Sequence, residues 1–309
     1  MHAISTALAV LAVLITLAAP AAAADLQVRH VTDNVYAIVG ELGQRSPENL
    51  GNNATFGLVV TDAGAVLVDP GGSWKGAEQR AAAVRTVTDQ PVRIVINSGG
   101  QDHRWLGNGY FSARGARIIA SAAAVADQQE RADAQLQGLE FLVGKAGLVG
   151  TEAVHADETF DDTMSLDFGG TRFALIATGG AHTPGDTVIW LPRQRVAFTG
   201  DMVYLERMLG VASFSDFKNW IPAFEGMAAL EPAHIVPGHG NPSTLARARA
   251  DTYDCLVNLN QRVSGVLKEG GTIEDGTAVD QEAFRYLLNF DQLARRNAQE
   301  VYIQLEFDF

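Results

Sequence analysis

The chain has 309 residues, a formal net charge of −13 and a single cysteine. The acidic balance, with no basic stripe, excludes a nucleic-acid-binding protein and a polybasic membrane-binding surface. Cys255 alone forms neither an intramolecular disulfide nor a cysteine-rich zinc site. Any metal in this chain must therefore be held by histidine and carboxylate side chains.

The first 24 residues contain no Lys, Arg, Asp or Glu and end in an Ala-x-Ala pattern at residues 22–24. This pattern predicts a cleaved signal peptide over 1–24, a mature chain from Asp25 and a periplasmic or secreted location. An uncleaved anchor is the alternative, but the apolar run is short for a membrane span. No later segment is long and apolar enough to hold the mature chain in a membrane.

The first half of the mature sequence alternates strand and helix patterns. Period-two alternation and β-branched runs predict strands at 28–40 (a pair), 56–60, 65–69, 92–97 and 116–120. Helical spacing of apolar residues predicts helices over 75–88 and 122–138. The Gly- and Asn-rich stretch 40–54 is expected to be a long loop.

The second half repeats this order. We expect hairpins at 164–178 and 186–201, a strand at 234–238, and helices at 220–230, 244–267 and 282–304. The order is typical of an α/β protein, and the similarity of the halves indicates two sheets sandwiched between helices. No linker separates the halves, so 25–309 is expected to be one domain with a C-terminal helical extension.

Five potential metal ligands lie beside the ends of predicted strands. They are Asp102, His103, His182, Asp201 and His239. Zinc accepts imidazole nitrogen and carboxylate oxygen, and a catalytic zinc lowers the pKa of a bound water to about 7. Each residue also has a purely structural interpretation, and for Asp201 after Thr-Gly this is a helix N-cap.

Five short motifs occur in a characteristic order. They are VLVDPGG (66–72), QDH (101–103), GGAHTPGD (179–186), FTGD (198–201) and VPGHG (236–240). In order and spacing the chain resembles the metallo-β-lactamase superfamily. The resemblance implies an αββα sandwich of two mixed sheets flanked by helices. It implies further that Asp102, His103, Asp201 and His239 hold one metal and that His182 is a ligand of another.

The first motif departs from the family pattern His-x-His-x-Asp-His. Ser98 and Gly100 stand where its first two histidines are expected. An alternative register, matched on Gly107-Asn108, puts His103 and Arg104 in the Asp-His places. Either register predicts at most one tightly bound metal ion, expected to be zinc, although iron and manganese also suit such ligands.

The resemblance also suggests roles for individual side chains. Asp102, or Asp201, is expected to act as a general base, and His182 to donate a hydrogen bond to a developing oxyanion. Asp69 is expected to order the site without binding metal. Ser98 is expected to be a turn serine, because no base adjoins it in sequence and Gly-x-Ser-x-Gly is absent.

The sequence therefore predicts an exported hydrolase that uses one zinc-activated water on a small ester, thioester or lactam-type substrate. Among the branches of the superfamily, it is most similar to the exported metallohydrolases found with quinoprotein and sulfur-oxidation systems. The alternative is a catalytically silent relative that binds a ligand or partner protein in the periplasm. The losses at Ser98 and Gly100 favour this alternative, and the four retained ligands count against it.

Overall fold

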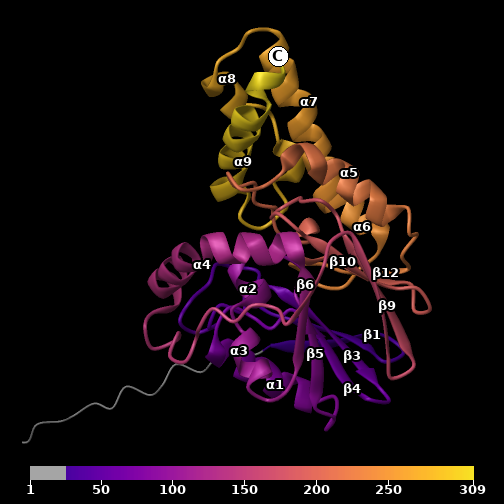
Figure 1. The fold of residues 1–309 in the computed structure, drawn as a ribbon. Coiled ribbons are helices and arrows are strands. Elements are labelled where there is room, and N and C mark those ends of the chain that lie inside the picture. The colour runs from indigo at the N-terminus through magenta and orange to yellow at the C-terminus, as the bar shows by residue number, and fades with distance from the viewer. Residues whose placement is uncertain (1–25) are drawn as a thin grey trace, which may run out of the picture.

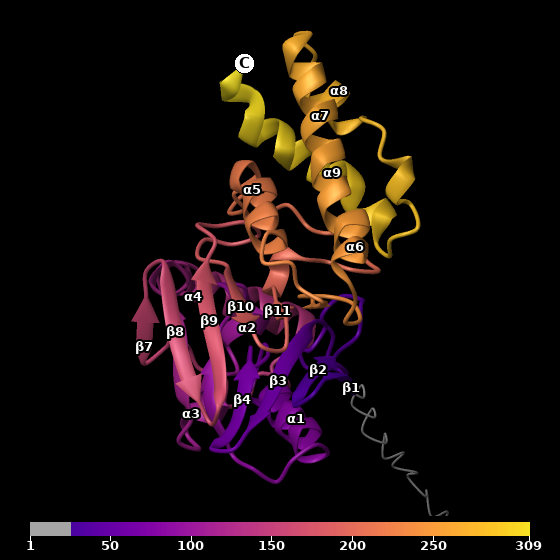
Figure 2. The same ribbon diagram turned by 90° about the vertical axis from the view of Figure 1, so that its right-hand side faces the viewer.

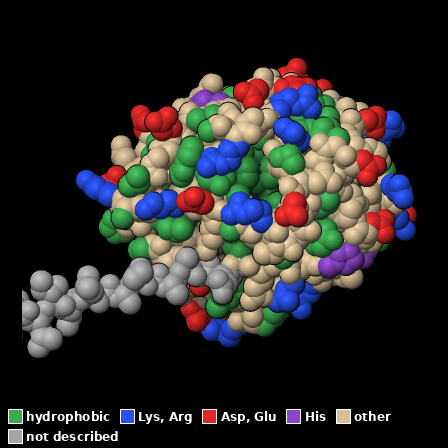
Figure 3. Space-filling model, turned by 90° about the horizontal axis from the view of Figure 1, so that it is seen from below, with side chains coloured by type: hydrophobic (Ala, Val, Ile, Leu, Met, Phe, Trp, Pro, Cys, Tyr) green, Lys and Arg blue, Asp and Glu red, His purple; other side chains and the backbone are tan. Residues whose placement is uncertain are grey.

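The computed structural model describes residues 26–309. The predicted signal peptide, 1–24, lies outside the described residues. Within 26–309, no helix has the length and apolar character needed to cross a bilayer. Charged side chains of both signs are interspersed on the face shown in Figure 3, with no segregated basic patch there.

The first sheet has seven strands in the order of the chain. They are β1 (Gln27–Thr32), β2 (Val35–Val39), β3 (Thr55–Thr61), β4 (Gly64–Val68), β5 (Val92–Ile96), β6 (Arg117–Ser121) and β7 (Glu158–Phe160). Strands β1 to β4 pair antiparallel and β4 to β7 pair parallel, so the sheet is mixed. The alternating stretch 28–40 forms the β1–β2 hairpin, as predicted.

The second sheet has five strands in the order β12-β11-β10-β9-β8. They are β8 (Thr163–Phe168), β9 (Thr171–Ala177), β10 (Thr187–Leu191), β11 (Val196–Phe198) and β12 (His234–Val236). Only the β11–β12 pairing is parallel. Both predicted hairpins are present, as β8–β9 and β10–β11.

The two sheets pack face to face around a shared apolar core (Figures 1 and 2). Val66 and Ile96 of the first sheet and Phe173 and Ile189 of the second belong to this core and are almost fully buried. At Gly57 an added Cβ would lie 2.4 Å from the ring of Phe198, so only glycine allows the sheets to approach this closely.

Helices cover both outer faces, which completes the predicted αββα sandwich. The first sheet is covered by α1 (Trp74–Arg85), α2 (Asp102–Trp105), α3 (Asn108–Ser112) and α4 (Ala122–Val143). The second sheet packs against α5 (Phe217–Ala228). Side chains on the outer face of each sheet are thereby removed from water, which is the main force that holds such layers together.

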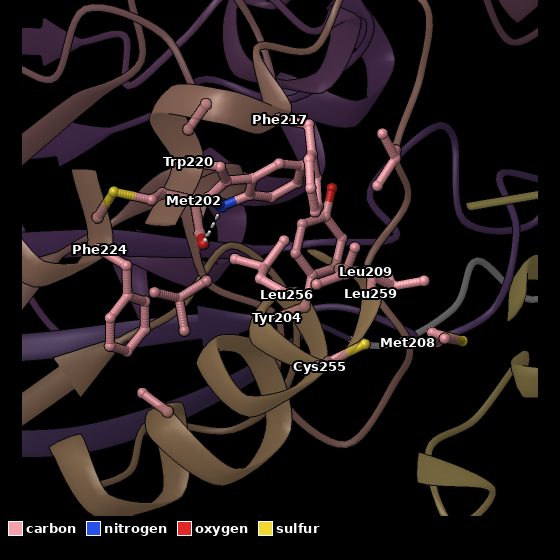
Figure 4. Packing of buried hydrophobic residues seen from close by; sticks show 14 of the residues in the cluster. Met202, Tyr204, Met208, Leu209, Phe217, Trp220, Phe224, Cys255, Leu256 and Leu259 are labelled. Carbon is pink, nitrogen blue, oxygen red and sulfur yellow. Dashed lines mark hydrogen bonds between the residues drawn. The ribbon is translucent and has the colours of Figure 1, made fainter. Parts of the chain in front are cut away.

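The C-terminal extension continues the layer of α5. It contains α6 (Leu245–Ala248), a π-helical turn (Arg249–Tyr253), α7 (Asp254–Lys268), α8 (Ile273–Thr277) and α9 (Phe290–Leu305). Its buried side chains share one cluster with residues that follow β11, and in that cluster the Trp220 indole N–H donates to the Met202 carbonyl at 2.9 Å (Figure 4).

The last helix begins later than the sequence predicts. A helix was expected from residue 282, but 282–284 form a single 3-10 turn and α9 starts at Phe290. Leu288 makes backbone hydrogen bonds with Glu206 and Met208, and Asn289 takes a left-handed conformation at φ 66°. The backbone of Leu288 pairs with the loop after β11 instead of joining a helix, and the left-handed Asn289 is the N-cap from which α9 begins.

Replacing Leu259 by Ala should lower the free energy of unfolding by about 2–5 kcal/mol, because this fully buried side chain of α7 would leave a cavity. Urea unfolding measures the change. Ile303→Ala, on the exposed side of α9, is the matched control and should change stability much less. Equal losses in the two variants would contradict the packing described here.

Candidate metal centre

Three turns at the ends of strands bring the site together. His103 lies in α2, which follows β5; Asp201 lies in a 3-10 turn directly after β11; and His239 lies just beyond β12. Because β11 and β12 are parallel neighbours, their carboxyl ends deliver Asp201 and His239 to the same edge of the second sheet. The site therefore spans the two sheets.

His103, Asp201 and His239 form a compact, buried group. Candidate ligand atoms of the three residues lie within 4.8 Å of one another. Nε2 of His103 lies 3.1 Å from Asp201 Oδ2, and Nε2 of His239 lies 3.1 Å from Asp201 Oδ1. Among the described residues, no other trio of His, Cys, Asp or Glu side chains meets this criterion.

Backbone carbonyls fix the tautomers of two histidines. Nδ1 of His239 lies 2.9 Å from the carbonyl oxygen of Asn53, and Nδ1 of His182 lies 3.0 Å from that of Gly210. Since a carbonyl only accepts, each Nδ1 carries the proton and each Nε2 keeps a lone pair, which is the form that binds metal. Burial lowers the pKa of His239 well below its usual value and that of His182 to about 4, so both rings are neutral at pH 7.

Asp102 lies beside His103 and outside the three-residue group. Its Oδ1 is 2.8 Å from His103 Nδ1 and 2.5 Å from Nη2 of Arg45. Burial raises the pKa of Asp102, but the charges of Arg45 and His103 outweigh it and hold the pKa below the usual value. A carboxylate at Nδ1 orients the ring and leaves Nε2 toward Asp201, as carboxylate–histidine pairs do around metals.

Arg104 is central to the site. From the sequence it had a place in the metal motif only in the alternative register. Its guanidinium donates to both oxygens of Asp201 at 2.6 and 3.1 Å and to Asp69 Oδ2 at 2.9 Å. Burial raises the pKa of Asp201, yet Arg104 and His103 keep it well below the usual value, so the carboxylate is ionised. Arg104 thus lies between Asp201 and Asp69 and holds both carboxylates.

Ser98 and Asp69 support this arrangement. Ser98 donates from its backbone N–H and from its hydroxyl to Asp69, at 2.6 and 2.7 Å. Among the described residues, no histidine is hydrogen-bonded to this hydroxyl. Asp69 thus links Ser98 to Arg104, and Ser98 has the geometry of a buried structural serine.

Close packing leaves no room for side chains at positions 99 and 100. A Cβ on Gly100 would lie 1.8 Å from Oδ2 of Asp127, and a Cβ on Gly99 would lie 2.5 Å from Asp186. Asp127 is held in place on α4 by an ion pair with Arg131. Side chains at 99 and 100 are excluded by carboxylates that fill the space.

His182 stands apart from the three-residue group, in the wall of the same cavity. Its ring contacts those of Tyr204, Phe214 and Trp220, with centroids 5.6–5.9 Å apart. The cavity has a volume of about 280 Å³. Its lining consists of Gln44, Arg45, Gln101, His103, His182, Tyr204, Arg207, Gly210, Val211, Ala212, Phe214, His239, Leu293 and Arg296.

The donor set fits one divalent transition-metal ion. Two imidazoles, at least one of them fixed as the Nδ1–H tautomer, and one ionised carboxylate are the ligand types that zinc accepts, and they leave a position open on the cavity side. Arg104 competes with a metal ion for Asp201, because it already donates hydrogen bonds to both carboxylate oxygens.

Replacing Arg104 by Gln should lower the free energy of unfolding by about 3–5 kcal/mol, because Asp69 and Asp201 would remain buried without their shared counter-charge. Denaturant unfolding measures the loss. Arg285→Gln removes an ion-paired but solvent-exposed arginine and should change stability little. An unchanged stability of the Arg104 variant would refute the structural role of the bridge.

Asp186 should make stability fall with rising pH. Burial raises its pKa to about 7, against hydrogen bonds from Thr183 that lower it. In the unfolded chain its pKa is about 3.9, so between about pH 4 and pH 7 the folded state holds a proton that the unfolded state has lost. The free energy of unfolding therefore decreases as pH rises through this range.

Asp186→Asn mimics the protonated carboxyl and should flatten the decrease, as measured by urea unfolding of chelator-treated protein from pH 5 to pH 8. Asp167→Asn is the control, because Asp167 is exposed and paired with Arg172. Parallel stability curves for wild type and Asp186→Asn would show that Asp186 titrates normally.

Curated proteins of other organisms are similar to parts of this chain, among them the following two. "Beta-lactamase-like protein 2 homolog" of Caenorhabditis elegans is 29% identical over 119 residues, 38% of this chain and 39% of that protein. Hydroxyacylglutathione hydrolase of Mesorhizobium japonicum is 34% identical over 146 residues, 45% of this chain and 52% of that protein. The matches thus span from about two fifths to about half of these relatives.

A solved metallo-beta-lactamase from Pontibacter korlensis has the same fold. It superposes with a TM-score of 0.59 at 21% identity, over 76% of this chain and 100% of that one. Residues 51–239, more than half of the chain, match the family model for the metallo-beta-lactamase superfamily. The matched residues begin in the loop before β3 and end at His239, so they include the whole candidate centre except Arg45. The chain belongs to the metallo-β-lactamase superfamily.

Proposed function

We propose that the protein is an exported hydrolase that holds one zinc ion on His103, Asp201 and His239 and attacks a small ester, thioester or lactam-type substrate. The observation that carries the proposal is the convergence of these three donors, buried and correctly oriented, at the wall of a cavity of about 280 Å³. Zinc bound in such a site supplies a water molecule whose pKa is lowered to about 7. The names of the relatives, a hydrolase and a lactamase, support the class of reaction.

A single ion is favoured by the packing around the first motif. Gly99 and Gly100 offer no ligands, and Asp127 and Asp186 fill the space that side chains there would need. His182 remains as an isolated neutral imidazole in the cavity wall. Because its Nδ1–H donates to the Gly210 carbonyl, its Nε2 can only accept. We therefore assign His182 the role of accepting a hydrogen bond from the reacting group, in place of the donor role expected from the sequence.

We give Asp102 a positioning role in place of the general-base role expected from the sequence. A carboxylate paired with Arg45 and His103, with its pKa held low, is a weak base toward water. Its contact with Nδ1 of His103 is better suited to hold the imidazole. Asp201 is likewise ion-paired with Arg104 and is a weak base for the same reason. We therefore expect solvent in the cavity to take up the proton.

Elemental analysis of protein purified without chelator tests the proposal. Wild type should contain about one zinc ion per chain, and His239→Ala should lose it because the site falls from three protein ligands to two. His30→Ala is the control, since this histidine lies on β1 and bonds only to the nearby Asp33 carbonyl. Two zinc ions per chain would refute the single-site assignment.

Activity is measured on matched esters, thioesters and lactams, with N-terminal sequencing of secreted protein to test cleavage before Asp25. Hydrolysis that is lost in His239→Ala, but not in His30→Ala, supports the enzyme. Protein that carries no metal and takes up none from added zinc would refute the hydrolase proposal and favour the alternative of a ligand-binding protein.

A further inference from the structure

The cavity beside the histidines has the opposite charge to the rest of the chain. Three arginines line it, Arg45, Arg207 and Arg296, and no lining residue in the described part of the chain is Asp or Glu. The chain as a whole carries a net charge of −13. Positive charge is therefore concentrated where a ligand enters, which is the usual arrangement for binding an anion.

Two of the three lining arginines, Arg207 and Arg296, form no ion pair among the described residues, and Arg207 is the more buried of the two. Within residues 26–309 it takes part in no ion pair, and its buried Nε has no hydrogen-bond partner. Its Nη1 makes only long contacts, 3.4 Å from the carbonyl oxygen of Gly43 and 3.4 Å from Nδ1 of His239.

A half-buried guanidinium whose Nε has no partner and whose Nη1 has only a carbonyl acceptor at 3.4 Å is costly, because it has lost more hydrogen bonding to water than it has regained. Its planar fork matches the paired oxygens of a carboxylate, sulfate or phosphate group. Arg45, already bound to Asp102, adds a second positive charge on the same side of the cavity. Arg296, on α9, stands exposed at the rim and adds a third.

Part of the cavity lining is apolar. It consists of Val211, Ala212, Phe214 and Leu293, and Leu293 comes from the helical extension that lies beyond the family match. A ligand that fills the cavity thus meets both guanidinium groups and aliphatic and aromatic carbon. Such a cavity suits an organic anion with an apolar portion.

We propose that Arg207, with Arg45, binds an oxyanion group of the substrate and that the segment 211–214 with Leu293 holds its apolar portion. Anion binding follows from the cavity alone. That the bound anion is also hydrolysed rests on the proposed function. Because Arg207 Nη1 is 3.4 Å from Nδ1 of His239, the anionic group lies next to the metal-binding residues.

Anion binding is measured by calorimetry at low ionic strength on the full, chelator-treated protein, with acetate, sulfate and phosphate as separate probes. At least one probe should bind wild type, and Arg207→Gln should weaken it at least tenfold. Arg207→Lys, which keeps the charge and loses the fork, should lie between them. The probe that binds tightest identifies the class of oxyanion.

Arg285→Gln is the matched control, because it removes one positive charge from an exposed ion-paired site outside the cavity lining. Melting temperatures confirm that the variants are folded. Equal binding by wild type and Arg207→Gln, or equal loss in Arg285→Gln, would overturn the proposal. So would binding of none of the three probes to wild type.

A second measurement separates this inference from the proposed function. An anionic ester and a neutral ester with the same apolar group are compared as substrates. Arg207→Gln should raise KM for the anionic ester by a larger factor than it changes KM for the neutral ester, whereas Arg285→Gln should change neither. Anion binding without any hydrolysis would support the anion site and refute the proposed hydrolase activity. Hydrolysis of the anionic ester with equal KM in wild type and Arg207→Gln would support the hydrolase and refute the anion site.

Discussion

The candidate centre depends on the guanidinium of Arg104. From α2 it reaches Asp201 after β11, Asp69 after β4, the carbonyl of Thr55 at the start of β3 and the carbonyl of Gly238 after β12. Every partner is buried, so these charge-assisted bonds act in a medium of low dielectric constant. One side chain therefore ties both sheets together at the edge where the histidines meet.

The rest of the centre follows from this bridge. With both carboxylate oxygens of Asp201 held, the Nε2 atoms of His103 and His239 face a carboxylate whose position is fixed. Asp69, oriented by Ser98, holds the other side of Arg104. On the far side of the first motif, Asp127 fills the space beside Gly100. Hydrogen bonds thus fix the side of the site that contains Arg104, and Asp127 fills the side next to Gly100.

The sequence was sufficient for the architecture and for much of the site. Period-two strands and helical spacing predicted the two sheets and their flanking helices, because these patterns follow from burial of one face. His103, Asp201 and His239 were among the predicted ligands, and the structure brings them together. The order of the strands places these three residues at one edge of the sheets, and the order of the family motifs made that placement predictable.

Other features depend on contacts that no local pattern records. Asp102 and His103 are adjacent in a single helical turn, where neighbouring side chains point about 100° apart, and letters alone do not show which one faces Asp201. Arg45 comes from a loop that had no predicted chemistry. Its partner Asp102 is 57 positions away. The late start of α9 likewise depends on Leu288 pairing with the segment after β11.

Charge balance connects the bridge to the cavity. Arg80 and Arg104 face Asp69 and Asp201, and Arg45 faces Asp102, so positive and negative groups cancel within this buried network. Arg207 stands outside that balance. Any cation held by the histidines adds to the same positive excess, and burial prevents water from fully screening it. A ligand that enters the cavity with its own oxyanion would supply negative charge beside Arg207.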